Sequence, residues 1–269
     1  MSRSQLAPGV EIVRVPGEGL AVRTAEGEFL RVRTGEVPEE DLLDRLTGGG
    51  VGTPGTGRLL EAFEAAGYTG PAAPPWPRHL RRVHVLGAPA LTRPLTGYLR
   101  AAGADPVPTA PGRVTAPDAD SSVPRPAAVV WCLDGPVPDG LWDHADRLPG
   151  HGIAWLRCHR EGCHAWLEPL AAGPGDVTSR HVRARRLAAT PAHRELAAYW
   201  NGHRVGGPHS PGSAASAGLI AALLAADLTA WATGTEQPGA LPANRRLRRI
   251  DVRTLRVTEH PVLPVPAVR

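Results

Sequence analysis

The segment Arg82–Leu95, RVHVLGAPALTRPL, limits the choice of fold more than any other part of the chain. Val83–Leu86 has the apolar character of a short strand, a turn follows at Gly87, and Leu91–Ala102 repeats apolar residues at helical spacing. A strand that turns directly into a helix is the first half of a βα crossover, which joins strands of a parallel sheet. The sequence therefore predicts an α/β domain that contains this segment.

The turn lacks two of the three glycines that a bound phosphate requires at such a crossover. In the pattern G-x-G-x-x-G, the glycines let the backbone approach the phosphates, which then bind at the helix N-terminus. Gly87 is present, but Pro89 and Thr92 stand at the second and third positions. Proline removes an N–H donor and obstructs the approach. We therefore expect that this degenerate loop binds no nucleotide and that the protein has no cofactor. We also expect a binding role rather than catalysis.

Length and composition leave room for two domains and exclude several kinds of site. The 269 residues exceed one average domain, and 42% hydrophobic residues suffice for packed cores. All 30 basic residues are arginine, so no lysine is available for a Schiff base or a phosphate-binding loop. Three cysteines are too few for a four-cysteine zinc site.

The sequence shows no typical targeting or membrane-spanning segment. The first residues, MSRSQLAPGVEIV, lack the apolar stretch of a signal peptide. The longest apolar segment, residues 214–232, contains Asp227 and predicts a buried helix rather than a membrane span. We therefore expect a cytoplasmic protein without a membrane partner.

Residues 1–72 predict a winged-helix-like domain of three strands plus helices. Three short alternating segments, separated by glycine-containing turns, predict strands over residues 10–15, 19–24 and 29–34. Pro38, which is followed by three acidic residues, predicts a helix start. A second helix is predicted over Arg58–Ala66, because its apolar residues recur at helical spacing.

A proline-rich segment, PAAPPWP at residues 71–77, predicts a stiff linker, and a second domain is expected over residues 78–269. Within that domain, residues 105–125 predict an irregular loop, and the apolar run at 127–133 predicts a strand covered on both faces. The further predictions are a short helix over 141–148, a hairpin over 153–167, a helical stretch over 177–200, a helix that ends at Trp231 and a strand pair over 248–263.

Charge is divided unevenly along the chain. Residues 1–70 hold 7 arginines and 11 acids, a net charge of −4, whereas the rest holds 23 arginines and 15 acids, a net charge of +8. Because a winged helix that reads DNA is basic, the acidic first domain disfavours the alternative of a DNA-binding regulator with a ligand-sensing α/β domain. Two arginine clusters are interpreted as solvated surface or as docking strips for an acidic peptide or partner enzyme: Arg180, Arg183, Arg185 and Arg186, and Arg245, Arg246, Arg248 and Arg249.

Two cysteine–histidine pairs lie close together in the predicted hairpin, Cys158 with His159 and Cys163 with His164. On paired strands, alternation would place the two cysteines on one face and the two histidines on the other. Two adjacent pairs on a flat ladder form a poor tetrahedron for zinc. We therefore expect no metal, and the pattern alone leaves the question open for these four residues.

Five stretches of the chain together resemble one protein family. They are EGEFLRVRTGEVPEEDLLDRL, LLEAFEAAGY, the crossover at residues 82–103, HAWLEPLAAGPGDVTSRHVRARRL and RRIDVRTLRVTEHPVLPVP. The family consists of the E1-like, or ocin-ThiF-like, proteins that partner YcaO cyclodehydratases in thiopeptide and other azole-containing peptide pathways. The resemblance implies an α/β fold, in which a winged-helix-like precursor recognition element precedes a degenerate Rossmann-like E1/ThiF-type domain.

The resemblance also implies a set of peptide-binding residues. In the family, the leader segment of a ribosomal precursor peptide adds a strand beside the third strand and packs against the last helix. The residues that this implies here are Phe29, Leu30, Arg31, Val32, Arg33, Arg58, Leu59, Leu60 and Phe63. Strand addition uses unpaired backbone groups for affinity and alternate side-chain pockets for specificity. Which face of the strand lines the groove stays open.

The chain departs from the catalytic members of this family, which use an acidic residue after the second strand and hold zinc with two cysteine pairs. Val107–Thr109 replaces the acidic residue, and Ser179 and residues 265–267 stand near the cysteine positions. The implied function is a non-catalytic homodimer that presents a precursor peptide to a YcaO-type cyclodehydratase and binds no nucleic acid. An active E1-like adenylyltransferase is the alternative.

Overall fold

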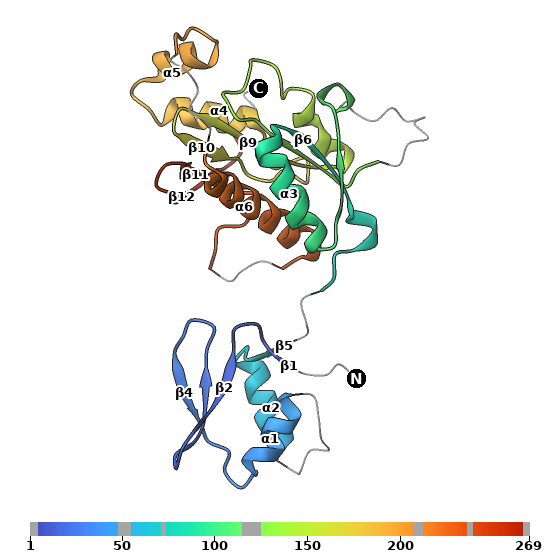
Figure 1. Ribbon diagram of the computed structural model, residues 1–269, viewed down its shortest axis with the longest axis vertical. Coiled ribbons are helices and arrows are strands. Elements are labelled where there is room, and N and C mark those ends of the chain that lie inside the picture. Colours follow the sequence, from blue (N-terminus) through green and yellow to red (C-terminus); the bar gives the residue numbers. More distant parts are fainter. Residues whose placement is uncertain are drawn as a thin grey trace. The chain divides into compact units, whose positions relative to one another are not determined.

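The computed structural model describes residues 5–47, 55–70, 74–114, 125–206, 212–235 and 239–265. The chain divides into two compact units, residues 1–74 and 75–269. The division falls inside the proline-rich segment 71–77, of which residues 71–73 lie outside the described part. Each unit contains its own sheet (Figure 1). Each also has its own hydrophobic core.

The first unit is built from a three-stranded antiparallel sheet and two helices. The sheet has the order β2 (Glu11–Val15), β3 (Gly19–Arg23), β4 (Phe29–Val32). The helices are α1 (Glu39–Leu46) and α2 (Thr56–Ala65), and two short strands, β1 (Gln5–Leu6) and β5 (Thr69–Gly70), pair with each other. The predicted three strands followed by helices are confirmed.

Both helices of the first unit cover the same face of its sheet (Figure 1). α1 begins directly after Pro38, and the acidic residues in its first turn interact favourably with the helix dipole. Leu42 and Leu46 of this helix are buried against Leu20 and Val22 of β3 and Phe63 of α2. The amphipathic spacing of the leucines therefore builds the core of this unit.

The second unit contains a seven-stranded mixed sheet of order β12-β11-β10-β9-β8-β6-β7. Four strands are parallel: β6 (Arg82–Gly87), β7 (Asp105–Pro108), β8 (Ala128–Cys132) and β9 (Ala154–Glu161). The other three, β10 (His164–Leu167), β11 (Arg246–Asp251) and β12 (Arg256–Pro261), extend the sheet antiparallel from β9. The predicted α/β class is confirmed.

Helices cover both faces of this sheet. α3 (Pro89–Ala101) and α6 (Ala214–Thr233) pack together and against one face. The 3-10 helix η3 (Ala145–His151) packs on the opposite face, where α4 (Ser179–Ala188) and α5 (His193–Trp200) also contact strand residues. Two further 3-10 turns are η1 (Arg78–Leu80) and η2 (Pro111–Arg113).

The prediction of an irregular loop over residues 105–125 is wrong in its first part. Residues 105–108 form β7, which pairs in parallel with β6. Two prolines fit there because β7 is the edge strand, where a missing N–H donor is tolerated. Residues 115–124 lie outside the described part of the chain.

Two helix predictions differ in detail from the structure. The segment predicted as a helix over 141–148 forms turns followed by η3, which contains Pro149. The helical stretch predicted over 177–200 is two helices, because Pro191 interrupts the backbone hydrogen bonds between α4 and α5.

α6 is long and apolar enough to span a membrane by length and composition alone. In the structure, one side of it packs into the core through Ile220, Leu224 and Leu228. The buried carboxylate of Asp227 pairs with Arg246 and Arg248 of β11, each at 2.5 Å. α6 therefore has the contacts of a core helix that is tied to the sheet through its one acidic residue.

Candidate functional site

β4, the strand that carries four of the predicted peptide-binding residues, lies at the edge of its sheet. Within the described residues its outer side pairs with no other strand. Leu30 and Val32 are in register with Val22 and Leu20, so they share the face that the helices cover. Val32 packs against the core, whereas Leu30 stays 42% exposed. This edge strand thus combines unpaired backbone groups with an accessible apolar side chain.

The other residues of β4 face away from the helices. Phe29 pairs with Arg23 and is 63% exposed. Arg31, on the same face, forms an ion pair with Glu18. Arg33 follows the strand and is exposed. The register therefore places Leu30 and Val32 on the helix-facing side of the strand and Phe29 and Arg31 on the opposite side.

α2 carries the remaining predicted peptide-binding residues. Arg58 is exposed, and Leu59 and Leu60 are half-buried against the core. Phe63 is 5% exposed and packs edge-on against Tyr68, with ring centroids 5.9 Å apart. Phe63 is therefore a core residue of the first unit.

The degenerate loop of the crossover is shaped by contact with the neighbouring strand. Gly87 has φ of +114°, and a Cβ atom there would overlap the carbonyl oxygen of Cys132. Ala88 donates a 2.8 Å backbone hydrogen bond to the same carbonyl. Pro89 is the first residue of α3, and the N–H of Thr92 donates to the carbonyl of Ala88. The remaining glycine thus serves close packing of β6 on β8.

In the hairpin, the two cysteines do not share a face of the sheet as the alternation predicted, whereas the two histidines do. Cys163 lies in the turn between β9 and β10 and is exposed, whereas Cys158 is buried beside Cys132 of β8. His159 and His164 do share one face, since they pair with Trp166 and Glu161 across the hairpin. Among the described residues, no group of three His, Cys, Asp or Glu side chains could hold a metal ion.

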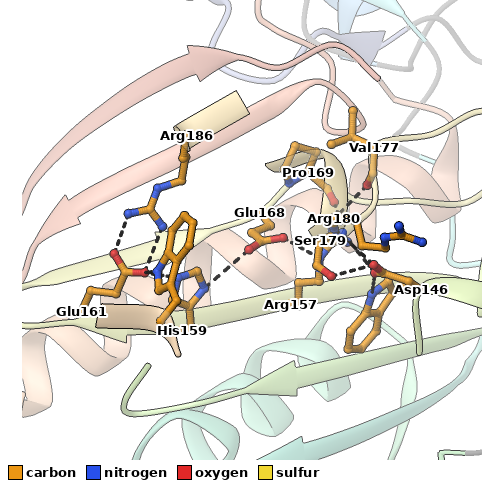
Figure 2. Close-up of polar contacts among 12 residues, drawn as sticks. Asp146, Arg157, His159, Glu161, Glu168, Pro169, Val177, Ser179, Arg180 and Arg186 are labelled. Atoms are coloured by element: carbon orange, nitrogen blue, oxygen red, sulfur yellow. Dashed lines mark hydrogen bonds and ion pairs between the residues drawn. The ribbon is translucent and has the colours of Figure 1, made fainter. Parts of the chain in front are cut away.

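A buried polar network, which the sequence analysis did not single out, lies on the η3 and α4 side of the large sheet (Figure 2). At its centre, Arg157 of β9 is fully buried and donates from Nε to Glu168 at 2.7 Å. Its other nitrogens donate to the carbonyls of Pro169 at 3.2 Å and Val177 at 3.0 Å. This arginine therefore fixes the segment that leads from β10 to α4.

Asp146 connects η3 to α4. Its carboxylate accepts hydrogen bonds from the hydroxyl of Ser179 at 2.6 Å, from the backbone N–H groups of Ser179 and Arg180, and from Nε1 of Trp155 at 3.0 Å. A carboxylate at this position satisfies free N–H groups of the first helical turn and interacts favourably with the helix dipole. Thr178 and His181 add a capping box to the same turn.

The carboxylate of Glu161, at the end of β9, lies within hydrogen-bond distance of three side chains. Arg186 of α4 binds both of its oxygens, and Trp200 of α5 donates from Nε1 at 2.6 Å. Nε2 of His159 lies 3.2 Å from the same carboxylate. Burial raises the pKa of Glu161, but the hydrogen bonds from His159 and Arg186 outweigh it and hold that pKa well below its ordinary value.

A cavity of about 420 Å³ opens beside this network. The loop at 137–143, β9, the residue after β10, α4 and α5 line it. The lining residues are Val137, Pro138, Asp139, Gly140, Leu141, Trp142, Asp143, His159, Glu168, Ser179, Arg180, Val182, Arg183, Arg186 and Trp200. Arg180, Arg183 and Arg186 belong to a predicted arginine cluster, so part of that cluster faces a cavity. The fourth member, Arg185, donates instead to the carbonyls of Leu263 and Pro264.

A sequence signal for this network exists in the alternation of β9. Arg157, His159 and Glu161 occupy every second position of a strand, so they share one face of a sheet. Three ionisable side chains in a row on an inner strand must find partners, because burial of unpaired charge is costly. The hairpin interpretation treated this pattern only as two cysteine–histidine pairs.

The comparisons with known proteins agree with this fold. No protein-family model matches the chain, and no curated protein matches it. Among solved structures, a heterocyclase in complex with substrate and cofactor has a TM-score of 0.68 at 15% identity, covering 98% of this chain and 39% of that one. The heterocyclase TruD gives 0.65 at 15% identity, covering 99% and 42%, respectively. E. coli MccB with ATP gives 0.58 at 12% identity, covering 99% and 98%.

This chain spans about two fifths of the length of the two heterocyclase chains and nearly the whole of MccB. At such low identity the similarity shows a shared fold. The chain therefore has the E1-like α/β fold of these solved structures, as the family resemblance of its sequence implied.

Proposed function

We propose that this chain is a non-catalytic leader-peptide-binding protein. It captures a ribosomal precursor peptide and presents it to a YcaO-type cyclodehydratase, which forms azolines and azoles on that peptide. The observation that carries the proposal is the unpaired outer side of β4, where the half-exposed Leu30 lies on the helix-facing side. An extended peptide binds such an edge by main-chain hydrogen bonds, and a hydrophobic side chain beside it supplies specificity.

Two further findings support this function. The fold is shared with heterocyclases, one of which is in complex with its substrate. The crossover of the second unit uses Gly87 to pack on Cys132 and begins its helix with Pro89, a residue without an N–H donor for a phosphate. We infer that the second unit serves as a scaffold for the partner enzyme, and that the protein is a cytoplasmic homodimer without a cofactor.

The proposal assigns the peptide to the helix-facing side of the edge strand. The test uses the full chain and, as probe, the fluorescently labelled leader of a candidate precursor, chosen as a short open reading frame near the gene with a tail rich in Cys, Ser and Thr. Leu30→Glu should weaken binding at least about tenfold, because a buried apolar contact becomes a charge. Phe29→Glu, on the opposite face of the same strand, is the matched control and should change the affinity little. Fluorescence anisotropy measures both.

Phe63 is unsuitable for this test, because its substitution would disrupt the core of the first unit. Equal affinities of the Leu30→Glu variant and the unmodified protein for the leader would overturn the proposed binding surface. A loss confined to Phe29→Glu would assign the peptide to the other face.

Adenylation is the second function that the fold permits, since MccB binds ATP with the same fold. ATP–pyrophosphate exchange in the presence of the precursor peptide separates the two functions. We expect no exchange above background, and saturable exchange would identify an active adenylyltransferase.

A further inference from the structure

The cavity beside α4 combines an apolar wall with polar groups that have no partner. Its volume of about 420 Å³ lies in the range of sites for small molecules. Trp142, Leu141, Val137 and Val182 supply apolar surface, and Trp200 supplies a second indole. The volume leaves room for a benzene ring, since an apolar cavity of about 150 Å³ already binds benzene.

Two buried nitrogen atoms of the cavity residues lack a hydrogen-bond partner within the described part of the chain. One is Nε1 of Trp142, whose side chain is 3% exposed, and an indole N–H can only donate. The other is Nδ1 of His159, which is 4% exposed and lies 3.6 Å from Glu168, beyond hydrogen-bond distance. Only the indole N–H is a donor in every protonation state, and a buried donor without an acceptor is costly, so an acceptor group in the cavity would relieve that cost.

The cations on one rim of the cavity are available to a ligand. Arg180 and Arg183 are three residues apart on α4 and therefore lie on one side of that helix. The side chain of Arg180 forms no hydrogen bond or ion pair among the described residues. Arg183 pairs with the exposed Asp139 at 3.7 Å, and its guanidinium lies over the ring of Trp200, 4.8 Å from the centroid. An exposed ion pair at this distance contributes little to stability, so a ligand can replace the Asp139 carboxylate.

The other charged side chains of the cavity either have ion-pair partners already or lie on the facing loop. Arg186 is bound to Glu161, and Glu168 is bound to Arg157. Asp139 and Asp143 stand on the loop opposite α4. Asp139 is the ion-pair partner of Arg183, so a negative group of the ligand would take its place beside that arginine.

We propose that this cavity is a binding site for a small aromatic anion, whose carboxylate or phosphate oxygens accept from Trp142 and pair with Arg180 and Arg183. The ring of the ligand contacts the indoles and aliphatic side chains. The site is independent of the edge strand, because all of its residues belong to the second unit.

The test titrates the full chain with benzoate, with phenyl phosphate and, as the uncharged analogue, with benzyl alcohol. Two-dimensional NMR follows the indole N–H signal of Trp142, which the Trp142→Phe variant identifies. We expect saturable downfield shifts with at least one of the two anions and none with benzyl alcohol. The tighter of the two anions identifies carboxylate or phosphate as the group that the site prefers.

Arg180→Gln and Arg183→Gln should each weaken binding about tenfold, the loss typical of one charge-assisted hydrogen bond. Arg194→Gln, an exposed arginine of α5 outside the cavity, is the matched control and should leave the affinity unchanged. Leader-peptide affinity should not change in any of these variants. The absence of a shift with both anions, an equal shift with benzyl alcohol, or binding insensitive to Arg180 and Arg183 would overturn the proposal.

Discussion

The carboxylate of Asp146 accepts a 2.6 Å hydrogen bond from the hydroxyl of Ser179, which joins η3 to the first turn of α4 across 33 residues of sequence. Because the same carboxylate also accepts from two backbone N–H groups and from Trp155, it connects the sheet, η3 and α4 at one point. The orientation of α4, and with it the position of the arginines at the cavity, depends on this contact.

Asp146→Asn should lower the free energy of unfolding of the second unit by about 2–3 kcal/mol, since hydrogen bonds to a charged acceptor are lost or weakened. Ser179→Ala should cost about 1 kcal/mol, because it removes one donor while the backbone contacts remain. Asp143→Asn, an exposed acid of the neighbouring loop, is the control. Urea denaturation measures all three, and an Asp146→Asn variant as stable as the control would contradict this role.

Glu168→Gln should be more destabilising, by about 3–5 kcal/mol, because it leaves the guanidinium of Arg157 buried without a countercharge. Arg157→Met removes that charge as well. The double variant Arg157→Met/Glu168→Gln should therefore lose less stability than the sum of the two single losses. A double-mutant cycle by chemical denaturation measures the coupling, and additive losses would show that the pair is not coupled.

Gly87→Ala should destabilise the second unit by about 3 kcal/mol or more, because its φ of +114° is unfavourable for alanine and the added Cβ meets the carbonyl of Cys132. Gly97→Ala is the matched control. It lies within α3 with nothing in reach of a Cβ, so it should stabilise by about 0.5–1 kcal/mol. Thermal and urea unfolding compare the two, and a tolerated Gly87→Ala would rule out the close approach.

Stability should fall as the pH drops below about 6.5. Burial lowers the pKa of His181 below its ordinary value of 6.5, with Arg157 and Arg180 acting in the same direction and Asp146 against it. The unfolded chain therefore binds this proton at a higher pH than the folded chain does, and acidification favours unfolding. Protonation also removes the Nδ1 acceptor that receives the N–H of Thr178.

His181→Asn keeps a side-chain acceptor and does not titrate, so it should reduce the loss of stability between pH 7.5 and 5.5. The pKa values of His84 and His164 are also lowered, both chiefly by burial, so the dependence should decrease and not vanish. Urea midpoints across this range measure the effect. A pH dependence identical to that of the unmodified chain would exclude His181 as a contributor.

Much of the fold follows from local patterns. Alternation between glycine-containing turns predicted β2, β3 and β4, and the apolar run before Leu133 predicted β8. Elements that depend on distant partners were predicted less well. β7 contains two prolines and is a strand only because β6 pairs with it, while the helical stretch 177–200 is divided by Pro191.

The sequence by itself determined the order of strands and helices, the uneven charge of the two units and the loss of the phosphate-binding glycines, because these depend on residue type and spacing. Tertiary structure alone decided that β4 is an edge strand, that Cys158 lies beside Cys132 and that Arg157 is buried against Glu168. Pairing and burial are set by contacts between distant segments, and a charged side chain has the same sequence signature whether it meets water or a buried partner.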